Sequence, residues 1–122
     1  MTVFRQFELE AIRLMANGVL SDRQMQFLCD AERLDSYEYT GCGYFLSVKH
    51  PSLPTEPRTL SEPAVVGKVG DIQAGFVVFI GYGELTLECH TLGPVDVPED
   101  FREREVVIST PPVNFVDLRD AT

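Results

Sequence analysis

The chain has 122 residues, 44% of them hydrophobic, which suits one domain with a proper core and excludes a disordered or low-complexity protein. Its formal net charge of −9 argues against nucleic acid or an anionic membrane as a partner, and suits solubility or attraction to a basic protein. No apolar run approaches the roughly 20 residues of a membrane span. Residues 1–10 lack the basic and then apolar pattern of a signal peptide, so we expect a cytoplasmic protein.

Two amphipathic helices are predicted within residues 1–35. Hydrophobic residues recur at helical spacing in the first helix, and its charged residues, Glu8 among them, are expected to lie mostly away from that stripe. Asn17-Gly18 fits a helix end, because both residues tolerate the left-handed conformation. Ser21 followed by Gln24 fits the capping box that begins a second helix, so the two helices form a hairpin.

The β-like part of the chain covers residues 37–110 and begins with the run 37–48. Gly41 and Gly43 interrupt this run. Glycines inside a strand mark a bulge, a bend or a close approach by another backbone. We interpret them here as the place where a helix lies over the strand, with a ligand that needs this space as the alternative.

Four prolines make residues 50–63 a long connecting loop, because proline lacks the N–H group that continuous sheet pairing needs. Residues 64–73 and 104–110 are each predicted to supply a strand. Residues 111–122 are a C-terminal tail. No linker divides the chain, so residues 1–122 are expected to form a single domain.

Residues 74–92 carry the strongest pattern, strand–turn–strand. The apolar run 75–80 predicts a strand in the middle of a sheet, and Gly81-Tyr82-Gly83 predicts a tight hairpin turn. Alternation in residues 84–91 then predicts an inner face of Leu85, Leu87 and Cys89 and an outer face of Glu84, Thr86, Glu88 and His90. The whole order predicts an α+β fold, with the N-terminal helical hairpin packed on one face of a roughly five-stranded, mainly antiparallel sheet.

The three cysteines, Cys29, Cys42 and Cys89, are too few and too widely spaced for a disulfide framework or a zinc site. Cys89 follows the inner face and is expected to be a core residue. Cys42 lies between glycines that leave its sulfur accessible, but no signature places a histidine beside it. The sequence therefore predicts no catalytic residue, no metal and no cofactor.

One alternative site deserves a test, on the outer face of residues 84–91. A carboxylate and an imidazole two residues apart, Glu88 and His90, are neighbours on one strand face and can transfer a proton or bind a metal. The alternative function is a small hydrolase or metal-dependent enzyme that uses Glu88 and His90, with Cys42 as a further candidate and Glu38 contributing across the sheet.

An acidic rim follows the central hairpin, and clustered carboxylates of this kind steer a cationic partner by long-range attraction. The predicted partner-binding residues are Asp96, Glu99, Asp100 and Glu103.

Several segments together resemble a group of small single-domain bacterial proteins with no established activity. They are Tyr39-Thr40-Gly41-Cys42-Gly43-Tyr44-Phe45, Gly70-Asp71-Ile72, the run 75–80 and Leu85-Thr86-Leu87-Glu88. The group has "F-T-G-x-G-F-F", "G-D-V", "G-F-V-L-F-I" and "L-E-G-Y-T" in this order, and it has Gly-Tyr where this chain has Cys89-His90. The resemblance implies the same architecture and transfers no functional residue.

The sequence favours a non-enzymatic acidic protein-binding domain for a basic partner, with an immunity-type or inhibitor protein as one specific version. A homodimer built through an exposed sheet edge or face is a third hypothesis.

Overall fold

A computed structural model describes residues 3–111, so the predicted tail beyond Pro111 lies outside the described residues. The helices and strands follow one another in the order α1 (Gln6–Met15), α2 (Asp22–Asp30), β1 (Ser36–Tyr39), β2 (Gly43–Lys49), β3 (Arg58–Leu60), β4 (Val66–Val69), β5 (Ile72–Gly81), β6 (Glu84–Thr91), the 3₁₀ turn η1 (Phe101–Glu103) and β7 (Val107–Ser109).

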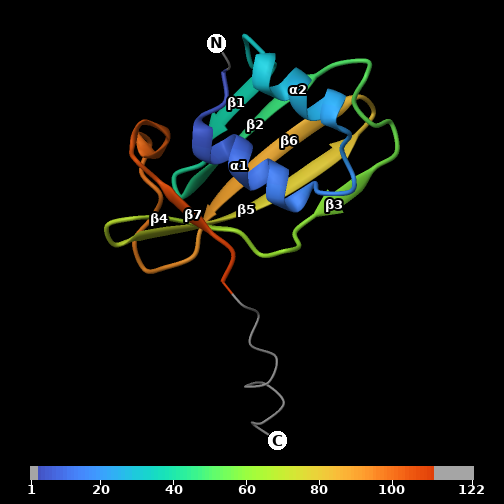
Figure 1. Ribbon diagram of the computed structural model, residues 1–122. Coiled ribbons are helices and arrows are strands. Elements are labelled where there is room, and N and C mark those ends of the chain that lie inside the picture. The colour runs from blue at the N-terminus through green and yellow to red at the C-terminus, as the bar shows by residue number, and fades with distance from the viewer. Residues whose placement is uncertain (1–2, 112–122) are drawn as a thin grey trace, which may run out of the picture.

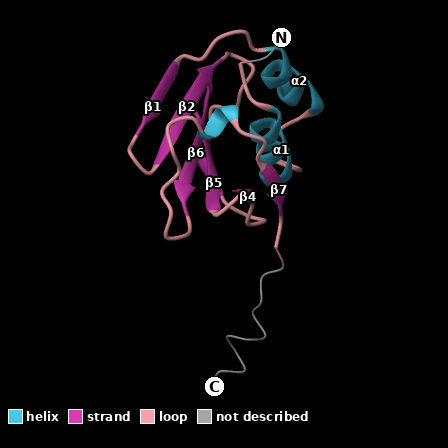
Figure 2. Ribbon diagram, turned by 90° about the vertical axis from the view of Figure 1, so that its left-hand side faces the viewer, coloured by secondary structure: helices cyan, strands magenta, loops and turns pink. Residues whose placement is uncertain are grey.

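The described strands form one antiparallel sheet of seven strands in the order β1-β2-β6-β5-β4-β7, with β3 beside the far end of β5. Both helices lie on the same side of this sheet (Figure 1). Seen from the side, the described residues form a helix layer and a sheet layer, and none of the described helices lies on the other face of the sheet (Figure 2). The predicted α+β fold is confirmed, with more strands than the roughly five expected.

The extra strands arise where glycine and proline act locally. Gly41 has a φ of 97° and turns the chain between β1 and β2, so residues 37–48 are a hairpin and not one strand. Gly70, with a φ of 59°, adds no strand but moves a boundary, because it ends β4 after Val69 and leaves residues 72–73 of the predicted strand 64–73 in β5. The proline-rich loop contributes the short strand β3. Its three residues lie between Pro57 and Pro63 and include no proline, so they can pair with β5.

The core forms between α1 and the inner face of the sheet. Phe7 of α1 packs against Phe76 of β5, with ring centroids 6.1 Å apart, and Leu87 of β6 is completely buried. The helical hairpin is confirmed. Ser21 Oγ accepts the Gln24 N–H at 3.1 Å and Gln24 Oε1 accepts the Ser21 N–H at 2.8 Å, which is the predicted capping box. Among the described residues, no helix is long and apolar enough to cross a membrane.

The sequence predicted that Glu8 lies away from the apolar stripe of the first helix, and this prediction is wrong. Glu8 is fully buried, because its carboxylate receives hydrogen bonds from the side chains of Arg102 and Tyr44 and from the Arg5 N–H. Arg102 comes from η1, which the chain reaches only after the whole central hairpin. The burial of Glu8 is therefore a product of tertiary structure.

The interpretation of Gly43 as the place where a helix lies over the strand is wrong. A Cβ atom at this position would lie 2.0 Å from the carbonyl oxygen of Cys89, which belongs to the neighbouring strand β6. The close approach is by another strand, and Gly41 lies in a turn.

Candidate functional site

The uncovered face of the sheet brings together most of the outward-pointing residues of three central strands. Cross-strand neighbours on this face follow from the register, because residues paired across an antiparallel ladder point to the same side. We call this surface the outer face; its residues are Phe45, Ser47, Val77, Phe79, Glu84, Thr86, Glu88 and His90. The predicted assignment of β6 residues to an inner and an outer face is confirmed by their alternating burial.

Glu88 lies at the centre of the outer face, between apolar neighbours. It pairs across the sheet with Phe45 of β2 on one side and with Val77 of β5 on the other. Glu88 and both neighbours are partly exposed. Within residues 3–111 the Glu88 carboxylate has no ion pair and no side-chain hydrogen bond. A carboxylate with apolar flanks and no internal partner is suited to receive a cationic side chain from another molecule.

His90 lies between two glycines. It pairs with Gly43 of β2 and with Gly75 of β5, and its Nε2 atom lies 2.6 Å from the place where a Cβ of residue 75 would be. The imidazole thus occupies the space that the missing side chain of Gly75 leaves free. Its Nδ1 atom is buried and has no hydrogen-bond partner in the described part of the chain. The neighbouring strands place no ionisable residue directly opposite His90.

The alternative catalytic set is only partly assembled. Glu88 and His90 share the outer face, but Glu38 pairs with Phe45, which stands between it and Glu88. Two strand spacings separate the Cα atoms of Glu38 and Glu88, about 10 Å. No group of three or more histidine, cysteine, aspartate or glutamate side chains within residues 3–111 is placed to hold a metal ion.

The two cysteines considered as nucleophiles have opposite surroundings. Cys89 is buried on the inner face as predicted, and burial, reinforced by the Glu8 carboxylate, raises the pKa of its thiol. Cys42 is exposed in the β1–β2 turn, with its Sγ 3.8 Å from Thr40 Oγ1. Its carbonyl, and not its sulfur, makes the link to β6 by accepting the Thr91 hydroxyl at 2.6 Å.

Neither histidine is hydrogen-bonded to the Cys42 sulfur in the described residues. His50 follows the other end of β2, more than about 20 Å along the strand from Cys42. It stacks on Phe27, with ring centroids 4.0 Å apart, and its Nδ1 lies 2.6 Å from Ser52 Oγ. A thiol–imidazole pair is therefore not formed by this arrangement.

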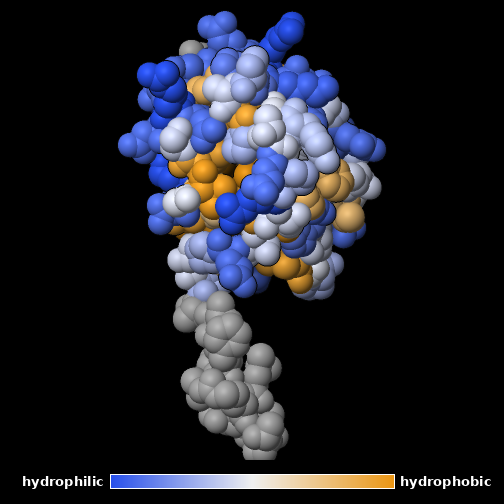
Figure 3. Space-filling view, turned by 90° about the vertical axis from the view of Figure 1, so that its right-hand side faces the viewer, coloured by the Kyte–Doolittle hydropathy of each residue, from blue (hydrophilic) through white to orange (hydrophobic). Residues whose placement is uncertain are grey.

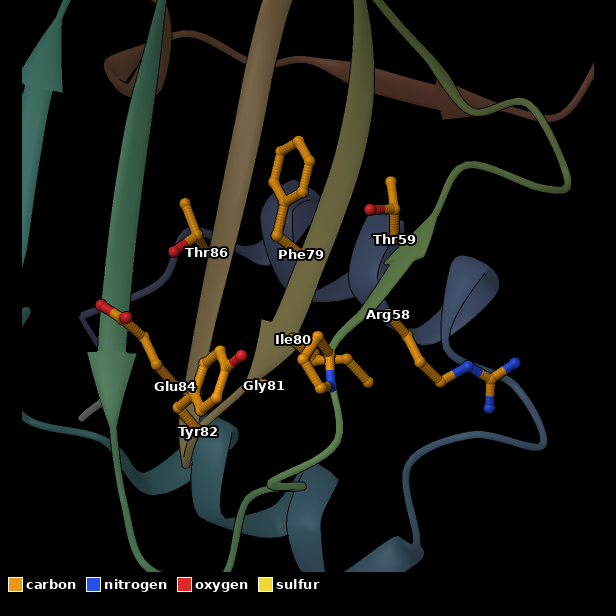
Figure 4. A pocket seen from close by; sticks show the side chains of 9 residues that line it. Arg58, Thr59, Phe79, Ile80, Gly81, Tyr82, Glu84 and Thr86 are labelled. Carbon is orange, nitrogen blue, oxygen red and sulfur yellow. The ribbon is translucent and has the colours of Figure 1, made fainter.

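A shallow, open groove of about 400 Å³ adjoins the outer face, between β3 and the tip of the β5–β6 hairpin. Phe79 stands between Thr59 and Thr86, and Tyr82 and Glu84 lie side by side at the lower end (Figure 4). Tyr82 is 84% exposed and Phe79 38%. From the β3 side of the molecule, hydrophobic side chains reach the surface in several separate patches (Figure 3). Exposed aromatic side chains next to polar ones are typical of protein-binding surfaces.

The acidic rim divides into two parts. Asp100 and Glu103 form surface ion pairs with arginines of the chain itself, Asp100 with Arg104 at 3.1 Å and Glu103 with Arg5 at 2.8 Å. Asp96 and Glu99 are exposed and have no such pair within residues 3–111. Of the four predicted partner-binding residues, these two keep their full charge available.

The sequence did not identify the cluster around Glu8. The Arg102 guanidinium binds Glu8 at two points and lies over the rings of Tyr37 and Tyr44, 5.6 Å and 5.9 Å from their centroids. The signal available was the spacing of Glu8 on α1, four residues after Phe4 and three before Ala11, within the apolar stripe. The cluster anchors η1 to α1, and the Glu8 side chain within it is completely buried.

No model of a known protein family matches this chain, and neither the curated proteins nor the solved structures contain a significant match to it.

Proposed function

We propose that this chain is a non-enzymatic, acidic protein-binding domain that uses its outer face to bind a basic protein. The observation that carries the proposal is the position of Glu88, a carboxylate without an internal partner among the described residues, between Phe45 and Val77 on an uncovered sheet face. The apolar neighbours would exclude water around a bound lysine or arginine, which strengthens the ion pair.

Charge supports the same partner class. The chain has 19 acidic and 10 basic side chains, so its net field attracts a basic protein and raises the rate of encounter. An immunity-type or inhibitor protein is the specific version in which fast capture of a basic partner matters most. The alternative of a small hydrolase or metal-dependent enzyme is less well supported, because Glu38 and Cys42 are not assembled with Glu88 and His90.

The test is affinity capture from source cells with three baits, the unchanged chain, Glu88→Lys and Glu62→Lys. Glu62 is exposed in the loop before β4 and is not one of the residues of the outer face, so it is the matched control for the change in charge. We expect a basic protein that is retained by the unchanged and control baits and lost with Glu88→Lys. Its association rate, measured with purified components, should fall as salt is added. Equal retention by all three baits would contradict the proposal, as would an association rate that ignores salt.

A further inference from the structure

One side of β1 is an open edge of the sheet. The Thr40 N–H donates to the Gly43 carbonyl at 2.9 Å, and hydrogen-bonded pairs alternate along an antiparallel ladder. Glu38 therefore bonds inward to β2, while the backbone N–H and C=O groups of Tyr37 and Tyr39 point outward. Nothing within residues 3–111 is hydrogen-bonded to these outward groups. β1 lies at the rim of the sheet, and none of the described strands lies beyond it (Figure 2).

The other outer strands of the described sheet are shorter and bounded by proline. β3 follows Pro57 directly, and β7 is followed by Pro111 after one intervening residue. Proline removes a backbone donor, and short strands with proline are a common protection of sheet edges. β1 is the longest of the three and has neither proline nor lysine. It is thus the edge best suited to accept another strand.

The surroundings of this edge are acidic. The Tyr39 hydroxyl donates to the Val97 carbonyl at 2.8 Å, which holds the loop after β6 beside β1. Asp96 and Glu99 of that loop are exposed. Partial desolvation raises the pKa of Tyr39, and the nearby carboxylates of Glu99 and Asp96 raise it further. Glu38 adds a third carboxylate from β1 itself. Arg102, whose guanidinium lies over the Tyr37 ring, already has its charge compensated by Glu8.

This charge discriminates between occupants. A second copy of the chain pairing through β1 would bring the same carboxylates together on both sides, and like charges across strands are destabilising. An extended segment rich in lysine or arginine would place opposite charges there instead. Charge complementarity therefore favours a basic strand over a homodimer at this edge.

We propose that the β1 edge binds an extended basic segment of a partner protein by strand addition, through the backbone groups of Tyr37 and Tyr39 and the carboxylates of Glu38, Asp96 and Glu99. This surface adjoins the outer face, because Glu38 pairs with Phe45, but it does not include Glu88, so the proposal does not depend on the role of Glu88. Backbone hydrogen bonds supply the affinity and the carboxylates select the charge of the segment.

The test uses the full ¹⁵N-labelled chain and three short synthetic peptides. One alternates lysine and valine, one alternates glutamate and valine, and one repeats the basic sequence with an N-methyl group on every residue, which removes the backbone donors from both edges of the peptide. We expect the basic peptide to slow hydrogen exchange of the Tyr37 and Tyr39 amides. N-methylation should weaken binding by about tenfold or more, because at least two hydrogen bonds are lost. The acidic peptide should not bind.

Charge variants complete the test. The double variant Asp96→Asn with Glu99→Gln should weaken binding of the basic peptide, whereas the control Glu62→Gln should leave this binding unchanged. Glu88→Lys should leave protection of Tyr37 and Tyr39 unchanged, which separates this proposal from the role of the outer face. Equal binding of the N-methylated peptide, protection confined to the outer face, or a concentration-dependent dimer that already protects the β1 amides would each overturn the proposal.

Discussion

Glu8 and Arg102 form a two-point ion pair in the interior of the protein. Arg102 Nε lies 2.7 Å from Glu8 Oε2, and Arg102 Nη2 lies 2.9 Å from Glu8 Oε1. The Tyr44 hydroxyl donates to the same carboxylate at 2.5 Å. Arg102 Nη2 also donates to the Val3 carbonyl, so one guanidinium joins η1 to the segment before α1.

Removing one partner of this pair should be strongly destabilising. We expect Arg102→Met to lower the free energy of unfolding by about 3–5 kcal/mol, because the Glu8 carboxylate is left buried without its counter-charge. The double variant Glu8→Met with Arg102→Met should recover much of this loss, since no buried charge remains. Urea unfolding followed by circular dichroism measures both. A loss below about 1 kcal/mol in the single variant would show that the carboxylate finds water or protonates instead.

Gly75 and Gly43 both lie beside His90, but only the destabilisation caused by Gly75→Ala should be reversed by removing the His90 side chain. A Cβ at residue 75 would meet the His90 imidazole, so Gly75→Ala should lower the free energy of unfolding by about 1–3 kcal/mol, and His90→Ala should restore most of it. A Cβ at residue 43 would meet the backbone of Cys89, which cannot rotate away. Gly43→Ala should therefore cost more and gain nothing from His90→Ala. Double-mutant cycles measured by chemical unfolding give the coupling energy of each glycine substitution to His90→Ala. Equal coupling energies at the two positions would contradict the prediction.

Alkaline pH should destabilise the fold through Cys89. Burial raises the pKa of this thiol above its ordinary value of 9.0, so above that pH the unfolded chain releases a proton that the folded chain retains. The folded state then binds more protons, and stability falls as pH rises, by about 1.4 kcal/mol per pH unit for one group. Cys89→Ala should make the free energy of unfolding fall less steeply with pH between about pH 9 and pH 10. Above that range Tyr44, whose pKa is also raised by burial, adds its own pH dependence to both proteins. Parallel stability profiles for the two proteins would contradict the assignment.

Replacing Tyr82 by a residue that suits its left-handed backbone conformation should stabilise the protein. It has a φ of 56° in the two-residue turn between β5 and β6 and is 84% exposed, so it has little burial to lose. Asparagine tolerates the left-handed conformation better, and Tyr82→Asn should raise the free energy of unfolding by about 0.5–1 kcal/mol. Tyr82→Val, β-branched and unsuited to this φ, is the matched control and should lower it. If both variants shift the unfolding midpoint in the same direction, backbone strain is not the cause.

Local patterns were enough to predict the elements that depend on local chemistry. The capping box at Ser21 and the glycine turn after Ile80 fix where α2 begins and where the central hairpin turns. Strict alternation from Glu84 places Cys89 inside and His90 outside. These features follow from neighbouring residues alone, which is why the two-layer architecture was correctly predicted.

Tertiary proximity was beyond these patterns. The sequence shows Glu8 within a helix and Arg102 within an acidic loop, but nothing in either segment says that they meet. The same holds for Gly75, whose missing side chain accommodates His90 from the next strand. For the proposed sites, alternation predicted that Glu88 points outward, whereas its apolar neighbours Phe45 and Val77 became known only from the strand register.

The ion pair between Glu8 and Arg102 also constrains how the protein can be made in the cell. The carboxylate is separated from its partner by 94 positions, so it leaves the ribosome well before Arg102 does. Until residue 102 has emerged, α1 cannot bury Glu8 without an unpaired charge, so the nascent chain must keep its N-terminal helix off the growing sheet. Native packing of α1 on the sheet is therefore a late event, which waits for the synthesis of residue 102.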